Sequence, residues 1–278
     1  MSNKVVMITG CSSGIGRALS QEFHRHGYRV VATARRIESL EALRNQGIGT
    51  ESLDVTDRQA AKRVVNSILA REGHIDILIN NAGYGLFGPT LDLPDEELVS
   101  QFHTNVFAPL YLIRLVAPAM RSRGDGMIIN IGSISGIVTT PFAGAYCASK
   151  AALHAFSDAL RMELAPYGIR VVSVQPGGIQ SDFGKNSGRS AERIMKPDSW
   201  YDGLKDSILS RAQVSQIGAT ASEEFARKLV GHVKGGSPPA IVRIGSRSFS
   251  LPFVKSVLPA TLLDSIFRKK FGLTKSMV

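Results

Sequence analysis

The sequence predicts a single doubly wound α/β domain over residues 1–278, in which a mostly parallel sheet carries helices on both faces. Three observations predict this class. Short apolar runs rich in Val and Ile alternate with longer segments of helical pattern. A glycine-rich turn joins the first apolar run to the first helical segment. The 278 residues contain no internal repeat and no linker long enough to separate a second domain.

The composition indicates a globular protein with an anionic partner. Hydrophobic residues make up 44% of the chain, and the formal net charge is +10. Lys and Arg are scattered, so we expect an anionic cofactor or an anionic membrane surface and no nucleic acid. Cys11 and Cys147 have no metal-ligand spacing with the histidines, which predicts no metal site. Without an apolar run of ~18 residues or a secretory leader, we expect a cytoplasmic protein.

The first strand, turn and helix have the order of a nucleotide-binding unit. Residues 4–9 predict a buried strand, and residues 17–27 predict a helix. Glycines in the turn between them permit a tight bend and close approach of a ligand to the backbone. The helix N-terminus presents N–H groups to a pyrophosphate. We therefore expect a dinucleotide to bind the turn residues Gly10, Ser12, Ser13, Gly14, Ile15 and Gly16.

Two arginines follow the second predicted strand, residues 29–33. A site for NAD(H) usually has Asp or Glu here to bind the ribose 2′-hydroxyl, but Ala34 stands in that place. Arg35 and Arg36 come next, and guanidinium groups bind a 2′-phosphate through charge-assisted hydrogen bonds. The alternative is a pair of solvated surface arginines. The placement favours NADP(H) over NAD(H).

Polar residues also follow the next two predicted strands. A helix over 37–47 leads to a strand over 49–53, which ends at Asp54 and Val55. Asp54 could accept a hydrogen bond from the adenine amino group, or cap the helix that begins near residue 56 or 57. A fourth strand, 76–79, precedes small residues where the ribose of a cofactor should pass. These residues are Asn81, Ala82 and Gly83.

Tyr146 and Lys150 are the candidate catalytic pair. On a helix over 146–165 they lie at i and i+4 on one face. A phenol keeps its proton until about pH 10, and an ammonium group beside it stabilises the phenolate. We therefore expect Lys150 to lower the pKa of Tyr146, which then acts as acid and base near neutral pH. Ser133 follows a strand over 127–131, at the sheet edge where ligands bind, and could hold a substrate oxygen.

Together these motifs resemble the short-chain dehydrogenase/reductase family, which has a Rossmann-type fold. The resemblance rests on TGxxxGIG at 9–16, NNAG at 80–83, Ser133 and the YxxxK pair, and it spans most of residues 4–181. The segments TGCSSGIG and ATARR are most similar to the branch that contains 17β-hydroxysteroid and retinol dehydrogenases. The family implies hydride transfer between a nicotinamide and a carbonyl or alcohol, in a homodimer or homotetramer.

The resemblance also implies roles for other residues. Asn105, in a helix predicted over 95–116, would brace Lys150 through a bound water in a proton relay, whereas an isolated Asn in a helix indicates a solvent-facing side chain. After a strand over 169–174, a Pro-Gly turn resembles the one on which the nicotinamide rests. The family pattern PGxxxT ends here in Ser. The cofactor set therefore also includes Tyr146, Lys150, Pro176, Gly177, Ile179 and Ser181.

The C-terminal third is expected to enclose the substrate. Residues 182–215, rich in Ser, Gly, Lys and Arg, predict an irregular substrate lid, with a surface insertion as the alternative. A helix over 222–233 and a last strand over 240–244 follow. The amphipathic tail, 249–278, is expected to pack on its own domain; contact with a membrane surface, with a substrate cleft or with another subunit is the alternative. Candidate pocket residues are Phe87, Ile137, Val138, Phe142, Phe183, Trp200 and Tyr201.

We therefore expect an NADP(H)-dependent oxidoreductase that interconverts a hydrophobic carbonyl compound and its alcohol. Its catalytic residues are Asn105, Ser133, Tyr146 and Lys150. A steroid, a retinoid, an acyl chain or a hydrophobic aldehyde would suit the apolar residues equally. The alternatives are a cofactor-binding regulator without turnover and a lipid-binding protein of the membrane surface. The presence of all four catalytic residue types argues against the regulator.

Overall fold

A parallel sheet of seven strands forms the centre of the molecule. The computed structural model of the chain describes residues 4–274. The strands are β1 (Val5–Ile8), β2 (Arg29–Ala34), β3 (Gly49–Ser52), β4 (Ile77–Asn80), β5 (Gly126–Ile131), β6 (Ile169–Val174) and β7 (Ile241–Val242). Their order in the sheet is β3-β2-β1-β4-β5-β6-β7, and every neighbouring pair is parallel. The predicted doubly wound α/β class is therefore confirmed.

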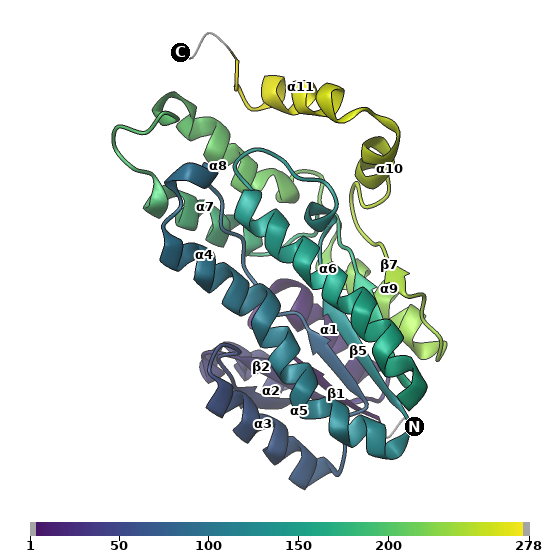
Figure 1. Cartoon of the computed structure of the whole chain (residues 1–278). Helices are drawn as coiled ribbons and strands as arrows, with labels where there is room; N and C mark the ends of the chain where they lie inside the picture. Colours follow the sequence, from purple (N-terminus) through teal and green to yellow (C-terminus); the bar gives the residue numbers. More distant parts are fainter. Residues whose placement is uncertain (1–3, 275–278) are drawn as a thin grey trace.

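Helices bury both faces of the sheet, as Figure 1 shows. Successive side chains of a strand point to opposite faces, and β1 divides its four apolar residues accordingly. Val6 and Ile8 pack in the core beneath α1 (Gly14–Arg25) and α9 (Ser222–Lys234). Val5 and Met7 pack in the opposite core, beneath α3 (Arg58–Glu72) and α5 (Ala108–Arg123). Because β1 is covered on both sides, it is apolar throughout instead of alternating.

The strand order reverses beside β1, which pairs with both β2 and β4. Parallel strands end at a common edge, and ligands of open α/β sheets bind at that edge near such a reversal. The glycine turn follows β1, the segment 80–83 follows β4, and Ser133 follows β5. The turn that contains Pro176 follows β6. The topology therefore brings four sequence motifs to one place.

Two predictions between β2 and α3 need correction. The helix expected over 37–47 is a 3₁₀ turn followed by a single α-helical turn, α2 (Glu41–Arg44), because Gly47 has a φ of 82° that ends it. The cap of α3 is Asp57, whose carboxylate accepts from the N–H groups of the second and third residues after it. Asp54 instead accepts from the backbone N–H (2.9 Å) and hydroxyl (2.7 Å) of Thr56.

The helix predicted over 95–116 is interrupted. It consists of α4 (Asp95–Phe102), a π turn at His103–Phe107, and α5, which runs on to Arg123. Asn105 lies in the π turn and is buried, so the solvent-facing alternative is wrong. A π turn adds a residue to the helical repeat, which rotates the following side chains, and such turns occur often at functional sites.

The helix that carries Tyr146 and Lys150 is α6 (Gly144–Leu164), close to the predicted 146–165. The segment 182–215 differs from its prediction because it is largely helical, with α7 (Phe183–Ile194) and α8 (Lys205–Gln213) packed together. The buried positions of α7 repeat at helical spacing and are mostly small: Gly184, Ser187, Gly188, Ala191 and Ile194. Small residues suggested a loop in the sequence, but here they are the packing face of a helix.

After the short strand β7, the tail forms α10 (Ser250–Val257) and α11 (Ala260–Lys270). Figure 1 shows these helices at the end of the molecule where α7 and α8 lie. Of the predicted tail, residues 275–278 lie outside the described residues. Within residues 4–274, no helix is long and apolar enough to cross a membrane.

Candidate active site

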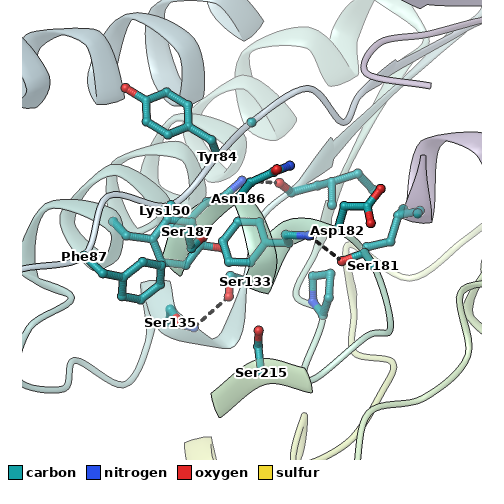
Figure 2. A pocket seen from close by; sticks show the side chains of 18 of the residues that line it. Tyr84, Phe87, Ser133, Ser135, Lys150, Ser181, Asp182, Asn186, Ser187 and Ser215 are labelled. Carbon is teal, nitrogen blue, oxygen red and sulfur yellow. Dashed lines mark hydrogen bonds between the residues drawn. The ribbon is translucent and has the colours of Figure 1, made fainter. Parts of the chain in front are cut away.

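One pocket of about 1520 Å³ opens at the carboxyl edge of the sheet. It is lined by every residue predicted to bind the cofactor except Gly16, and by three of the four predicted catalytic residues. Asn105 is the exception among the catalytic residues. Figure 2 shows part of this lining, including Ser133, Lys150 and Ser181. The structure therefore gathers motifs from 10 to 181 around one space.

The glycine turn forms a cradle that side chains would fill. Gly10 and Gly14 have φ values of +73° and +55°, which side chains rarely adopt. A Cβ on Gly16 would lie 2.3 Å from the carbonyl oxygen of Gly10. The Asn81 amide donates to the carbonyls of Thr9 (2.8 Å) and Gly10 (3.0 Å), so it braces the turn. With the N-terminus of α1 behind it, this rigid backbone suits a pyrophosphate.

Arg35 and Arg36 are exposed at the end of β2 and line the pocket. Within residues 4–274, neither guanidinium group has an ion pair. Asp54 and Val55 line the same pocket. Free arginines beside a site for the adenine ribose suit a 2′-phosphate, since they lose no existing partner when they bind it.

The Pro-Gly turn after β6 closes the other side of the cradle. A Cβ on Gly177 would lie 1.9 Å from the carbonyl oxygen of Ser246, so glycine is required for this close approach. A Cβ on Gly14 would lie 2.7 Å from the Cβ of Ser181. Ser181 therefore contacts the glycine turn, where the sequence predicts a cofactor hydroxyl contact. The donors and the space present fit a dinucleotide.

Tyr146 is buried against aromatic rings at the inner end of the pocket. Its ring centroid lies 5.7 Å from that of Phe87 and 5.3 Å from that of Phe183. Burial raises the pKa of Tyr146 to about 12, while a hydrogen bond with Ser133 and the positive charge of Arg211 act in the opposite direction. The Tyr146 hydroxyl therefore keeps its proton at neutral pH.

Lys150 does not lower the pKa of Tyr146 as the sequence predicts. Its Nζ donates to the carbonyl oxygen of Ile131 (2.8 Å) and lies 6.0 Å from the centroid of the Tyr146 ring. Burial lowers the pKa of Lys150 itself to about 8. Desolvation of the phenol outweighs the charges around it, so the pKa of Tyr146 shifts in the direction opposite to the predicted one. The i, i+4 placement on α6 is correct.

Asn105 holds the chain segment that lies beside Lys150. Its Oδ1 accepts from the N–H of Tyr84 (3.2 Å), and its Nδ2 donates to the carbonyl of Tyr84 (3.0 Å) and the hydroxyl of Ser149 (3.1 Å). A Cβ on Gly83 would lie 3.0 Å from Asn105 Oδ1 and 3.7 Å from Lys150 Nζ. Both polar groups therefore flank Gly83, with no direct hydrogen bond between them among the described residues.

A buried histidine that the sequence analysis missed supports Ser133. His154 Nε2 accepts from the backbone N–H of Ser133 (3.3 Å), and the Ser133 hydroxyl accepts from the N–H of Ser135 (3.0 Å). Burial, followed by the charge of Lys150, lowers the pKa of His154 to about 4, so the ring is neutral. A Cβ on Gly132 would lie 2.2 Å from Nε2. The i, i+4 spacing from Lys150 was the available signal.

The apolar residues predicted to form the aromatic wall of the pocket are confirmed only in part. Phe87, Val138 and Phe183 line the pocket, and Phe142 and Tyr201 pack in the same aromatic cluster. Trp200 is 85% exposed, and Ile137, Phe142 and Tyr201 do not line the pocket either, so these four assignments are wrong. Trp200 lies in the segment between α7 and α8, where its side chain faces solvent.

The tail contributes to the same wall. Phe267 and Lys270 of α11 line the pocket, as does the buried Phe271, whose ring centroid is 6.3 Å from that of Phe142. The end of the tail thus packs on its own domain and also covers the cleft. Arg211 of α8, likewise missed by the sequence analysis, lines this region; nothing in the sequence separates it from the other basic residues of the chain.

Comparisons with known proteins agree with this geometry. The family model for short chain dehydrogenases matches residues 4–192. A probable short-chain type dehydrogenase/reductase, VdlC, of Helicobacter pylori is 35% identical over 272 residues, covering 95% of this chain and 96% of that protein. An NADPH-dependent 1-acyldihydroxyacetone phosphate reductase of Schizosaccharomyces pombe is 35% identical over 280 residues, covering 96% and 94%.

Solved structures give the same result. A short-chain dehydrogenase from Streptomyces avermitilis superposes with a TM-score of 0.80 at 29% identity, covering 97% of each chain. The closed form of a serine dehydrogenase in complex with NADP⁺ superposes with a TM-score of 0.75 at 26% identity, covering 87% of this chain and 94% of that one. The chain belongs to the short-chain dehydrogenase/reductase family and is an oxidoreductase of the Rossmann-type fold.

Proposed function

We propose that this protein is an NADP(H)-dependent reductase of hydrophobic carbonyl compounds. The observation that carries the proposal is the pair of Ser133 and Tyr146, which line the pocket together between an aromatic wall and the glycine cradle. A carbonyl oxygen between these two hydroxyls would receive two hydrogen bonds as negative charge develops on it. NADPH supplies the hydride when it is bound.

The residues of the chain divide the remaining work. Tyr146 donates its proton to the oxygen that becomes the alcohol, and its high pKa keeps it protonated until that oxygen becomes basic. Ser133 orients the same oxygen, and His154 and Ser135 fix the position of Ser133. Lys150, with a pKa of about 8, exchanges protons with water near neutral pH and can resupply the site through the polar groups around Gly83.

The preference for NADP(H) is proposed from Arg35 and Arg36. Their guanidinium groups have no ion pair within residues 4–274 and lie where a 2′-phosphate would need charge. The NADPH-dependent reductase of Schizosaccharomyces pombe and the NADP⁺-bound serine dehydrogenase support the proposal by similarity.

The aromatic wall supports a hydrophobic substrate. The aromatic rings at the inner end of the pocket gain more by burying the apolar surface of a hydrophobic ligand than by contacting a sugar or a small polar alcohol. An acyl chain, as in the substrate named for the Schizosaccharomyces pombe reductase, suits this wall. The resemblance to 17β-hydroxysteroid and retinol dehydrogenases points to ring-shaped apolar ketones and aldehydes as further candidates.

Substitution of Tyr146 by Phe tests the proposal. The variant keeps the ring contacts with Phe87 and Phe183 but has no proton to donate, so we expect turnover of any accepted carbonyl to fall by roughly 10²- to 10⁴-fold. The loss of NADPH absorbance with a panel of apolar ketones and aldehydes measures it. A Phe variant with the wild-type rate on a proven substrate would overturn the mechanism and favour a cofactor-binding regulator.

A further inference from the structure

Arg211 places a buried positive charge in the substrate part of the pocket. It lies on α8, is 6% exposed and lines the pocket. Its Nε donates to the hydroxyl of Thr140 (2.5 Å), and its guanidinium carbon is 5.0 Å from the centroid of the Phe87 ring. The Phe87 ring also contacts Tyr146, so a single aromatic ring separates the charge of Arg211 from the proposed proton donor.

Arg211 has no acidic partner among the described residues. Its Nη groups form no hydrogen bond there either. Arg193 of the same wall, by contrast, is 63% exposed and pairs with Glu97. A buried cation without a counter-charge is costly, and burial accordingly lowers the pKa of Arg211. The cost is recovered if a ligand supplies the missing negative charge.

Two hydroxyl groups of α7 in the same pocket also lack partners. Ser187 and Ser190 line the pocket, and the oxygen of each is buried without a hydrogen bond. Figure 2 shows Ser187 among the residues that line the pocket with Phe87. Buried polar groups without partners are uncommon in folded proteins. Ser187 lies beside the Phe87 ring, over which the Arg211 guanidinium group stacks, so a donor of α7 and one of α8 stand close enough to serve one ligand group with several acceptor oxygens.

We propose that Arg211 receives an anionic group, a carboxylate or a phosphate, carried by the substrate. The proposal rests on the proposed reductase function and narrows its substrate class to carbonyl compounds that have both an apolar part and an anionic group. The apolar part lies on the aromatic wall, and the anion pairs with Arg211 at the junction of α7 and α8. Arg211 is then a residue that selects the substrate.

The test compares three probes of equal chain length: octanoate, n-octyl phosphate and 1-octanol. Titration calorimetry measures their binding to the full chain with and without NADPH. No turnover is needed, so the result is independent of the Tyr146→Phe test. The variants are Arg211→Met, which keeps the length and removes the charge, and Arg211→Lys, which keeps the charge and removes the planar donor pair. Arg193→Met is the matched control on the same wall.

We expect the wild type to bind at least one anion roughly 10- to 100-fold more tightly than 1-octanol, because the pair is buried. Arg211→Met should abolish this preference and leave the affinity for 1-octanol and for NADPH within about 2-fold. Arg211→Lys should retain part of the preference for the anion over 1-octanol, and Arg193→Met should retain all of that preference. The anion that binds more tightly identifies the group as carboxylate or phosphate.

Three results would overturn the proposal. In the first, wild-type protein binds 1-octanol as tightly as both anions; this comparison needs no variant to fold. In the second, Arg211→Met weakens all three probes equally, which would assign Arg211 to the packing of α8 against Thr140 and Phe87. Retained anion preference in a folded Arg211→Met protein has the same consequence.

Discussion

The pocket has two halves built in different ways. The strand-end half consists of the lining residues that follow β1, β2, β4, β5 and β6, where glycines and backbone groups set the shape. The helical half consists of the lining residues of α7, α8 and the end of α11, where side chains set the shape. Under the proposed function, the rigid backbone edge would bind the cofactor and the exchangeable side chains would bind the substrate.

Acid should destabilise the strand-end half first, because Ser133 in that half is held by the buried His154 of α6. The ring has a pKa of about 4 in the folded chain against 6.5 ordinarily, so between these values only the unfolded chain takes up the proton. The stability contributed by the neutral ring is complete above pH 6.5 and is lost as the pH falls towards 4, by up to about 3 kcal/mol.

Urea unfolding at pH 7 and pH 4.5 measures this loss in the wild type and in His154→Gln. The amide oxygen of Gln can still accept from the N–H of Ser133, but the side chain does not titrate. We expect the free energy of unfolding of the variant to depend much less on pH in this range. An equal loss in both proteins would show that His154 is not the responsible group.

A methyl group in the cradle should weaken cofactor binding. Gly14→Ala puts a Cβ at a φ of +55°, 2.7 Å from the Cβ of Ser181. Strain of this kind costs about 1–3 kcal/mol, so we expect the Kd for NADPH to rise roughly 10- to 100-fold. Gly203→Ala, near the start of α8, is the control because its Cβ would meet nothing within 4 Å. Equal Kd values for the two variants would contradict the rigid cradle.

These two halves also differ in how far the sequence predicts them. Glycine spacing, strand ends and the YxxxK pair are local patterns, so the sequence alone assigns Gly10, Ser133 and Tyr146 to one site, and all three line the pocket. The small residues of α7 resemble a loop because sequence alone does not show that Gly184 and Gly188 face another helix. The isolation of Arg211 from every acid within residues 4–274 is a property of tertiary packing.

The sign of the Tyr146 pKa shift was missed for a related reason. The i, i+4 rule places Lys150 one turn away, but the rotamer that turns its Nζ to the Ile131 carbonyl depends on how α6 packs on β5. Burial of the phenol by Phe87 and Phe183, which lie far from it in sequence, adds the larger opposing effect. Pairwise spacing alone therefore identifies the residues but not the direction of the shift.

Substitutions in the tail should have the smallest effect, and that effect should be on binding to membranes. Phe249 and Phe253 at the start of α10 are 67% and 66% exposed, beside Lys255 in a chain of net charge +10. We propose that this surface contacts an anionic membrane. Co-sedimentation with phosphatidylserine vesicles should weaken roughly 10-fold in Phe249→Ser/Phe253→Ser, with no change in NADPH binding. Equal sedimentation with neutral phosphatidylcholine vesicles, or with the variant, would contradict this contact.

The most direct test of the account is a fluorescence titration of the purified protein with NADPH and with NADH. The unpaired Arg35 and Arg36 predict that NADPH binds at least ~10-fold more tightly, and that Arg35→Asp removes the preference while NADH binding is retained. Binding of neither nucleotide would contradict the assignment of the strand-end half to a cofactor. A preference for NADH would leave the reductase proposal standing but would show that Arg35 and Arg36 are solvated surface residues without a role in cofactor selection.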